Sequence, residues 1–207
     1  MNEKKCSPDY SRAAEMACRC LIRLGVDSLP IRPADVISRC RNTLLMDFGQ
    51  AAEALDIPED EFERRYGAAD AFTFRYALAD GQVSYLVCYR AGGNAARLNF
   101  TLAHELGHIV LRHQSGRPWE EYEADCFAAN LLCPAPILGQ LRRRRTDLYA
   151  EELAELCFIT LSAAETIAAQ ASCPLSKSVE EAILAQFAGN IPLNPTKKPS
   201  PGWHRIA

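Results

Sequence analysis

The chain has 207 residues, of which 48% are hydrophobic and 24% charged, and its formal net charge is −3. This length suits one globular domain with a small appendage, and the slightly acidic balance excludes a general attraction to nucleic acid or to an anionic membrane surface. No apolar stretch is long enough to span a membrane, and the polar first ten residues do not resemble a signal peptide. We therefore expect a cytoplasmic protein with no membrane partner.

Nine cysteines are scattered along the chain, and no two of them form a CxxC pair. A secreted disulfide framework is normally shorter and denser in cysteine. We expect most of these residues to be reduced, small apolar side chains.

The first third of the chain predicts short helices around one strand. Apolar residues recur at helical spacing over residues 11–24, where Gly25 ends the run, and a second short helix is expected at 34–40. A strand is predicted at 43–48, followed by a helical pair near Pro58.

A β-hairpin is the clearest strand signal. Residues 71–76 and 83–89 are rich in aromatic and β-branched side chains, and Asp80-Gly81 between them is typical of a hairpin turn. Together with the helices, this hairpin predicts an α+β fold with a small, mostly antiparallel sheet.

The rest of the chain predicts helices. One begins near Asn99 or Thr101, either of which can cap it, and runs through His113. A second covers residues 119–133, and short helices follow over residues 135–186.

These elements predict three parts. Residues 1–134 would form the core with its N-terminal helices, and residues 135–187 a helical subdomain packed on it. Residues 188–207 are rich in proline and have little to bury, which is typical of a disordered tail.

The motif with the clearest chemistry is His104-Glu105-Leu106-Gly107-His108. Two histidines four residues apart lie on one face of a helix, where they can share a tetrahedral zinc ion. Glu105 could accept a proton from an activated water molecule and pass it to a leaving amine. An exposed helix that merely holds two histidines is the alternative, but the apolar residues around the motif favour a buried helix.

A catalytic zinc ion needs a third protein ligand. His113 lies five residues after His108 and faces elsewhere, so it would face solvent or contact a ligand from behind. On the next helix, Glu121 falls on a small, apolar stripe that packs inward, whereas Glu123 points the other way. Glu121 is therefore the expected ligand and Glu123 the alternative.

Two neighbours of these ligands have expected roles. Asp125 lies one turn after Glu121 and could fix the tautomer of a ligand histidine. Glu120 and Glu123 suit a solvated first helical turn. Gly107 would allow another backbone to come close, and we expect a substrate strand or the edge of the sheet there.

These residues resemble a known family. The segments RLNFTLAHELGH (97–108) and EYEADCFAANLLCP (121–134) are similar to the ImmA/IrrE zinc metallopeptidases. The resemblance implies a thermolysin-like (zincin) core with a sheet beside the HExxH helix. It also implies His104, His108 and Glu121 as zinc ligands, Glu105 as general base, and a helix-turn-helix repressor as a frequent protein substrate.

Two weaker features do not change this interpretation. The run Arg142–Arg145 could contact phosphates, but a solvated surface fits the acidic chain better. Residues 151–169 faintly suggest a helix-turn-helix motif but lack the residues of a recognition helix, so we expect no direct nucleic-acid binding.

The sequence thus predicts a zinc-dependent endopeptidase that acts on a regulatory protein. The alternative is a metal-bound sensor or protein-binding module without protease activity. Two histidines and one carboxylate suit zinc, although manganese and iron remain alternatives.

Overall fold

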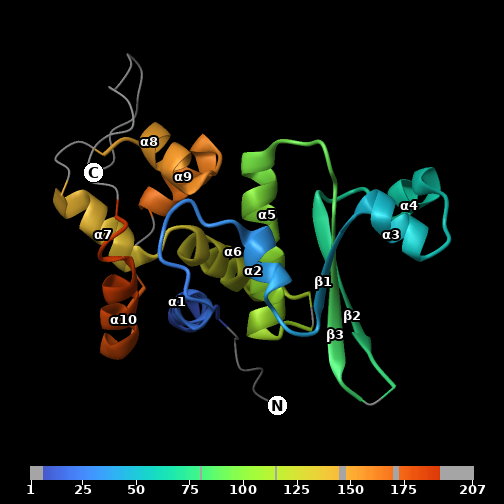
Figure 1. Cartoon of the computed structure of the whole chain (residues 1–207), viewed down its shortest axis with the longest axis horizontal. Coiled ribbons are helices and arrows are strands. Elements are labelled where there is room, and N and C mark those ends of the chain that lie inside the picture. Colours follow the sequence, from blue (N-terminus) through green and yellow to red (C-terminus); the bar gives the residue numbers. More distant parts are fainter. Residues whose placement is uncertain (1–6, 80, 115, 145–147, 170–172, 192–207) are drawn as a thin grey trace.

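The computed structural model describes residues 7–79, 81–114, 116–144, 148–169 and 173–191, in which ten helices accompany a three-stranded sheet (Figure 1). In chain order the elements are α1 (Tyr10–Leu24), α2 (Pro33–Ser38), β1 (Thr43–Asp47), α3 (Phe48–Ala54), α4 (Glu59–Tyr66), β2 (Ala71–Ala77), β3 (Val83–Tyr89), α5 (Ala95–Leu111), α6 (Pro118–Leu132), α7 (Ala135–Arg144), α8 (Ala150–Cys157), α9 (Leu161–Ala169) and α10 (Lys177–Phe187). The α+β class is confirmed. No helix in these ranges is both long and apolar enough to cross a membrane.

The sheet has the strand order β1-β3-β2. The predicted hairpin is present, because β2 and β3 pair antiparallel with Ala71 opposite Tyr89. However, β1 pairs with β3 in parallel, so the expectation of a mostly antiparallel sheet was wrong: the sheet is mixed. The chain passes through α3, α4 and β2 before it returns beside β1, and the pattern of a single strand does not specify its partner.

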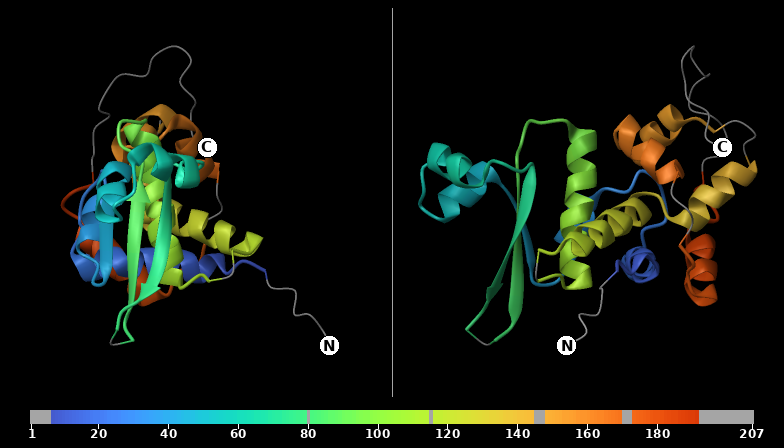
Figure 2. Two further views of the ribbon diagram at one scale, coloured as in Figure 1. Left: turned by 90° about the vertical axis from the view of Figure 1, so that its right-hand side faces the viewer. Right: turned by 180° about the vertical axis from the view of Figure 1, so that it is seen from behind.

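The sheet separates two cores because alternate strand residues point to opposite faces. On one face, Phe72 and Phe74 pack with Phe48 of α3 and Phe62 of α4. On the other face, Ala71 and Val87 belong to the main core around α5. Figures 1 and 2 show this layering, with α3 and α4 on one side of the sheet and α5 on the other.

Helix α5 begins one turn earlier than predicted. Asn94 caps it by accepting a hydrogen bond from the backbone N–H of Arg97, and the helix ends at Leu111, before the left-handed residue Arg112. Asn99 is buried and instead donates to the carbonyls of Ile31 and Phe158. The cap predicted at Asn99 or Thr101 was therefore wrong, because Asn94 begins the helix instead.

Helices α5 and α6 pack closely at Gly107. A Cβ atom placed there would lie 3.2 Å from both Cα and the carbonyl oxygen of Ala124, and 3.1 Å from the Phe127 ring. The backbone beside Gly107 is therefore that of α6, and the expectation of a substrate strand or sheet edge was wrong. This close approach positions the acidic first half of α6 beside the HExxH motif.

The C-terminal helices share the main core. Ile183 and Phe187 of α10 are buried in it, and so is Ile191, which lies in the segment predicted as a tail. Arg142 donates to the Ala168 carbonyl at 2.7 Å, so it joins α7 to α9 and is not simply solvated. The division at residue 134 stays a prediction, and Arg145 and residues 192–207 lie outside the described residues.

Replacing Gly107 with alanine tests the α5–α6 contact. We expect Gly107→Ala to lower the free energy of unfolding by about 1–2 kcal/mol, because crowding at a packed site costs about 1–3 kcal/mol and exceeds the gain of about 1 kcal/mol in helix propensity. The matched control is Gly139→Ala on α7, where the new Cβ would meet only an Arg143 nitrogen at 3.7 Å. Urea unfolding measures both variants. Gly139→Ala should keep the gain in helix propensity without the crowding. If Gly107→Ala stabilised the protein as much as Gly139→Ala does, the close contact at Gly107 would be contradicted.

Candidate metal centre

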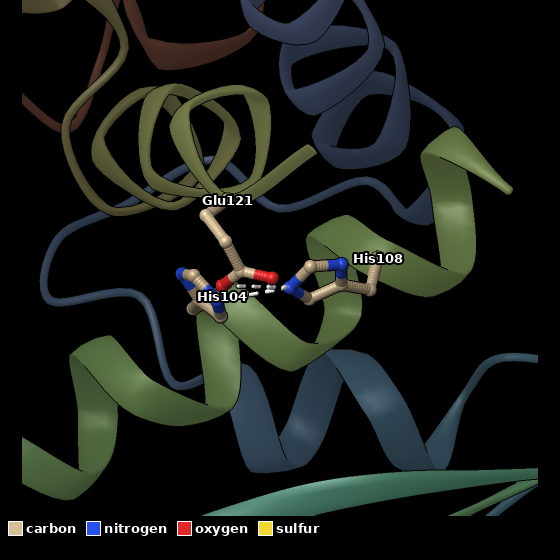
Figure 3. Close-up of side chains that lie close together, drawn as sticks. All are labelled: His104, His108 and Glu121. Atoms are coloured by element: carbon tan, nitrogen blue, oxygen red, sulfur yellow. Dashed lines mark hydrogen bonds and ion pairs between the residues drawn. The ribbon is translucent and has the colours of Figure 1, made fainter. Parts of the chain in front are cut away.

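Two helices bring three potential ligands together. Helix α5 places His104 and His108 on one face, and α6 places Glu121 opposite them (Figure 3). The Nε2 atoms of the two histidines are 3.0 Å apart, and Glu121 Oε2 lies 3.3 Å from His104 Nε2 and 3.6 Å from His108 Nε2. The three donor atoms thus converge on one point.

This donor set fits a divalent cation. In tetrahedral zinc sites with bonds of about 2.0–2.2 Å, ligand atoms lie about 3.4 Å from one another. The three separations of 3.0, 3.3 and 3.6 Å bracket that value. Two neutral imidazoles that turn Nε2 lone pairs toward each other and toward a carboxylate would repel without a positive charge between them.

The outer nitrogens of both histidines have partners that favour this tautomer. His104 Nδ1 lies 2.8 Å from Asp125 Oδ1, where its N–H can donate. His108 Nδ1 lies 3.0 Å from His113 Nδ1, and His113 Nε2 lies 3.1 Å from Glu123 Oε2. A proton on His108 Nδ1 would leave the proton of His113 on Nε2, facing Glu123. Both sets of hydrogen bonds, behind His104 and behind His108, leave the Nε2 atom of the histidine free for a metal.

The structure separates the two candidate acids on α6. Glu121 is about half exposed and lies beside the histidines, whereas the Glu123 side chain is only 8% exposed and lies away from them. Glu123 accepts a hydrogen bond from the backbone N–H of Asp9 at 2.8 Å. The expectation of a solvated Glu123 was therefore wrong, because α1 packs against α6 and its first turn, with Asp9 and Arg12, covers Glu123.

His113 does not face solvent. Its side chain is 7% exposed between His108 and Glu123, so of the two expected positions it takes the one behind a ligand. No local pattern in the sequence indicates the His113–Glu123 pair. Only the turn after α5 at Arg112, combined with α1 packing on α6, brings His113 and Glu123 together.

Glu105 is held by the sheet. The Thr73 hydroxyl of β2 donates to Glu105 Oε2 at 2.6 Å. Burial raises the pKa of Glu105 above its ordinary value, although the Thr73 hydrogen bond and the charge of His104 lower it. Thr73 could not be predicted from the sequence, because the alternation of side chains along a strand does not reveal which face meets the helix.

The two histidines differ in charge preference. Burial opposes the charged form of His104, but the hydrogen bond and charge of Asp125 outweigh it, so the pKa of His104 is raised. Burial and the neighbouring His104 lower the pKa of His108. The sequence predicted that the motif is buried. Side-chain exposures of 18% for His104 and 21% for His108 show instead that it opens to solvent on one side.

Removing the charge behind His113 should weaken metal binding. Glu123→Gln takes away the carboxylate that fixes the His113 proton on Nε2, and we expect metal affinity to fall about 10–100-fold. Competition with a chelator measures this affinity. Glu181→Gln removes the same charge from the exposed face of α10 and serves as the control. Unchanged affinity in Glu123→Gln would show that the His113–Glu123 pair does not support the site.

Comparison with known proteins agrees with this geometry. Residues 66–166 match a family model described as an IrrE N-terminal-like domain of the M78 peptidases, and the match contains the hairpin, α5 and α6. No match was found among curated proteins. Over residues 66–166, this match confirms the resemblance to the ImmA/IrrE family of metallopeptidases.

Proposed function

We propose that this chain is a zinc-dependent endopeptidase that hydrolyses a peptide bond in a regulatory protein. The observation that carries the proposal is the convergence of His104, His108 and Glu121 beside the carboxylate of Glu105. A helix-turn-helix repressor is the proposed substrate, a choice supported by the resemblance to ImmA/IrrE proteins.

The chain's own residues suit the two proton transfers of peptide hydrolysis. A divalent cation held by the three ligands would supply Lewis-acid polarisation and lower the pKa of a water molecule. Glu105 would accept the proton of the attacking water and donate it to the leaving nitrogen. Its raised pKa brings it nearer to neutrality, where a carboxyl group can act in both roles.

The edge of the sheet offers a place for the substrate backbone. Strand β2 pairs only with β3 in the described part of the chain, so its other edge can pair with an extended peptide. Thr73 of β2 contacts Glu105, which places this edge strand beside the proposed base. We propose that the substrate lies along β2 as an added strand.

Cleavage by matched variants tests the proposal. Wild-type protein with zinc should cleave a helix-turn-helix repressor encoded beside it, and Glu105→Gln should lose about 100–10,000-fold in rate while it keeps its metal. Glu121→Gln should lose both metal and activity, and Glu181→Gln neither. Metal content and peptide fragments are measured by mass spectrometry.

Two results would contradict the proposal. Equal cleavage by wild type and Glu105→Gln would remove Glu105 from the mechanism. Bound metal without cleavage of any neighbouring protein would favour the sensor or binding module.

Thr73 allows a test of the base through its pH dependence. The Thr73 hydrogen bond lowers the pKa of Glu105, so Thr73→Val should raise that pKa. A general base works when deprotonated, and the acidic limb of the kcat/KM profile should therefore move to higher pH. Thr73→Ser keeps a hydroxyl and should restore the wild-type limb. If the pH profile of Thr73→Val were unchanged, the acidic limb would not report the ionisation of Glu105.

A further inference from the structure

A second cluster of reactive side chains lies on the far side of α5. A pocket of about 380 Å³ is bounded by α1, by the segment after α2, and by Leu106, Ile109 and Val110 of α5. At about 100° per residue, these three residues lie on the face of α5 opposite to His104 and His108. The pocket is therefore separate from the candidate metal centre.

Two cysteines line this pocket and contact each other. Cys20 lies on α1 and Cys40 follows the end of α2, and within this pocket each thiol is close enough to shift the pKa of the other. Both residues are half-buried, so small solutes can reach them. The Cys40 thiol also lies 3.3 Å from the Val36 carbonyl oxygen, which holds its sulfur beside α2.

The same pocket is strongly basic. Arg19, Arg23, Arg39 and Arg41 all line it, with Glu15 paired to Arg19 at 2.6 Å as a partial counter-charge. Arg39 donates to the Leu24 carbonyl, a contact that holds its guanidinium near the end of α1. Guanidinium groups around a thiol favour the thiolate, which is the form that reacts with oxidants.

The charges act unequally on the two thiols. The hydrogen bond from Cys20 lowers the pKa of Cys40 to about 7, and Arg23 and Arg39 act in the same direction against burial. The pKa of Cys20 is raised, chiefly by its hydrogen bond to Cys40. By contrast, burial raises the pKa of Cys18 and Cys126 to about 12. Cys40 is thus suited to attack an oxidant as a thiolate, and Cys20 is suited to attack the oxidised Cys40 and complete a disulfide.

We infer that Cys20 and Cys40 form an oxidation site for hydroperoxides, with Cys40 as the attacking thiolate and Cys20 as the resolving thiol. Cys40 attacks one peroxide oxygen, the O–O bond breaks, and hydroxide leaves as Cys40 becomes a sulfenic acid. The Cys20 sulfur then attacks the Cys40 sulfur and water leaves. In sum, two thiols and one hydrogen peroxide give one disulfide and two waters, and the oxidised site joins α1 to the segment after α2.

The chain contains its own comparison pairs. Cys126 and Cys173 have sulfur atoms 4.0 Å apart, and Cys133 and Cys157 are both buried in the core, close enough for Cys133 to shift the pKa of Cys157. Burial is the main cause that raises the pKa of Cys126. The Cys157 pKa is also raised, first by its hydrogen bond to Cys133 and then by burial. Contact between two cysteines is shared by all three pairs, so basic surroundings and access should decide which pair reacts first.

Selective oxidation tests the inference. The reduced full-length chain is treated with a few molar equivalents of hydrogen peroxide, free thiols are alkylated, and peptides are mapped by mass spectrometry. The Cys20–Cys40 disulfide should form first and disappear with dithiothreitol. Cys40→Ser should abolish it, Cys20→Ser should leave a Cys40 sulfenic acid that dimedone traps, and Cys173→Ser should leave it unchanged.

The rate of alkylation tests the role of the arginines. Arg23→Gln with Arg39→Gln should slow alkylation of Cys40 at neutral pH about two- to fivefold, since the lost thiolate fraction outweighs the gain in intrinsic nucleophilicity. Arg64→Gln, which removes an exposed arginine on α4, is the control. A rate equal to that of the control would contradict Cys40 as the attacking thiolate. Oxidation that links Cys126 to Cys173 first, or that leaves Cys20 and Cys40 open to alkylation, would overturn the inference.

Discussion

The contact between α5 and α6 at Gly107 is the constraint on which the candidate metal centre depends. Two of the candidate ligands lie on α5 and the third on α6, so their convergence requires a short distance between the helices. A side chain at residue 107 would meet the backbone of Ala124, one turn from Glu121. Glycine is costly inside a helix, but here it lets a carboxylate on one helix reach two imidazoles on the other.

The surroundings of the ligands extend this constraint outward. Asp125 holds His104 from α6 itself, whereas His108 is held through His113 and Glu123. Glu123 is in turn anchored by the backbone N–H of Asp9, just before α1. The N-terminal helix thus supports a candidate ligand, His108, that lies about a hundred residues later in the chain. Such outer contacts fix the ring orientation and the tautomer on which metal affinity depends.

The sheet helps to position the candidate site because successive side chains of its strands point to opposite faces. On β2, Phe72 and Phe74 point to the aromatic core under α3 and α4, while Thr73 points to α5 and binds Glu105. The same strand therefore stabilises one layer of the fold and positions the proposed base in another. On the opposite face of α5, the Cys20–Cys40 pair occupies a basic pocket with different chemistry. One central helix thus separates the candidate metal centre from the pocket that holds the two cysteines.

Local patterns were enough to predict much of this protein. Helical periodicity, the hairpin and the HExxH spacing are properties of neighbouring residues, and helical geometry separated Glu121 from Glu123. The start of α5 was predicted one turn too late, although Asn94 is itself a favourable helix cap in the sequence.

Only the tertiary structure decided which segments cover each face of the sheet and of the helices. It paired β1 with β3 in parallel, buried Glu123 under α1, turned Thr73 toward Glu105 and placed Cys20 beside Cys40. Each of these contacts joins residues that are far apart in the chain, and their formation depends on packing of the whole core. The sequence therefore determined the candidate ligands and their spacing, whereas packing decided what surrounds and supports them, because a periodic pattern shows that a face is buried but not what buries it.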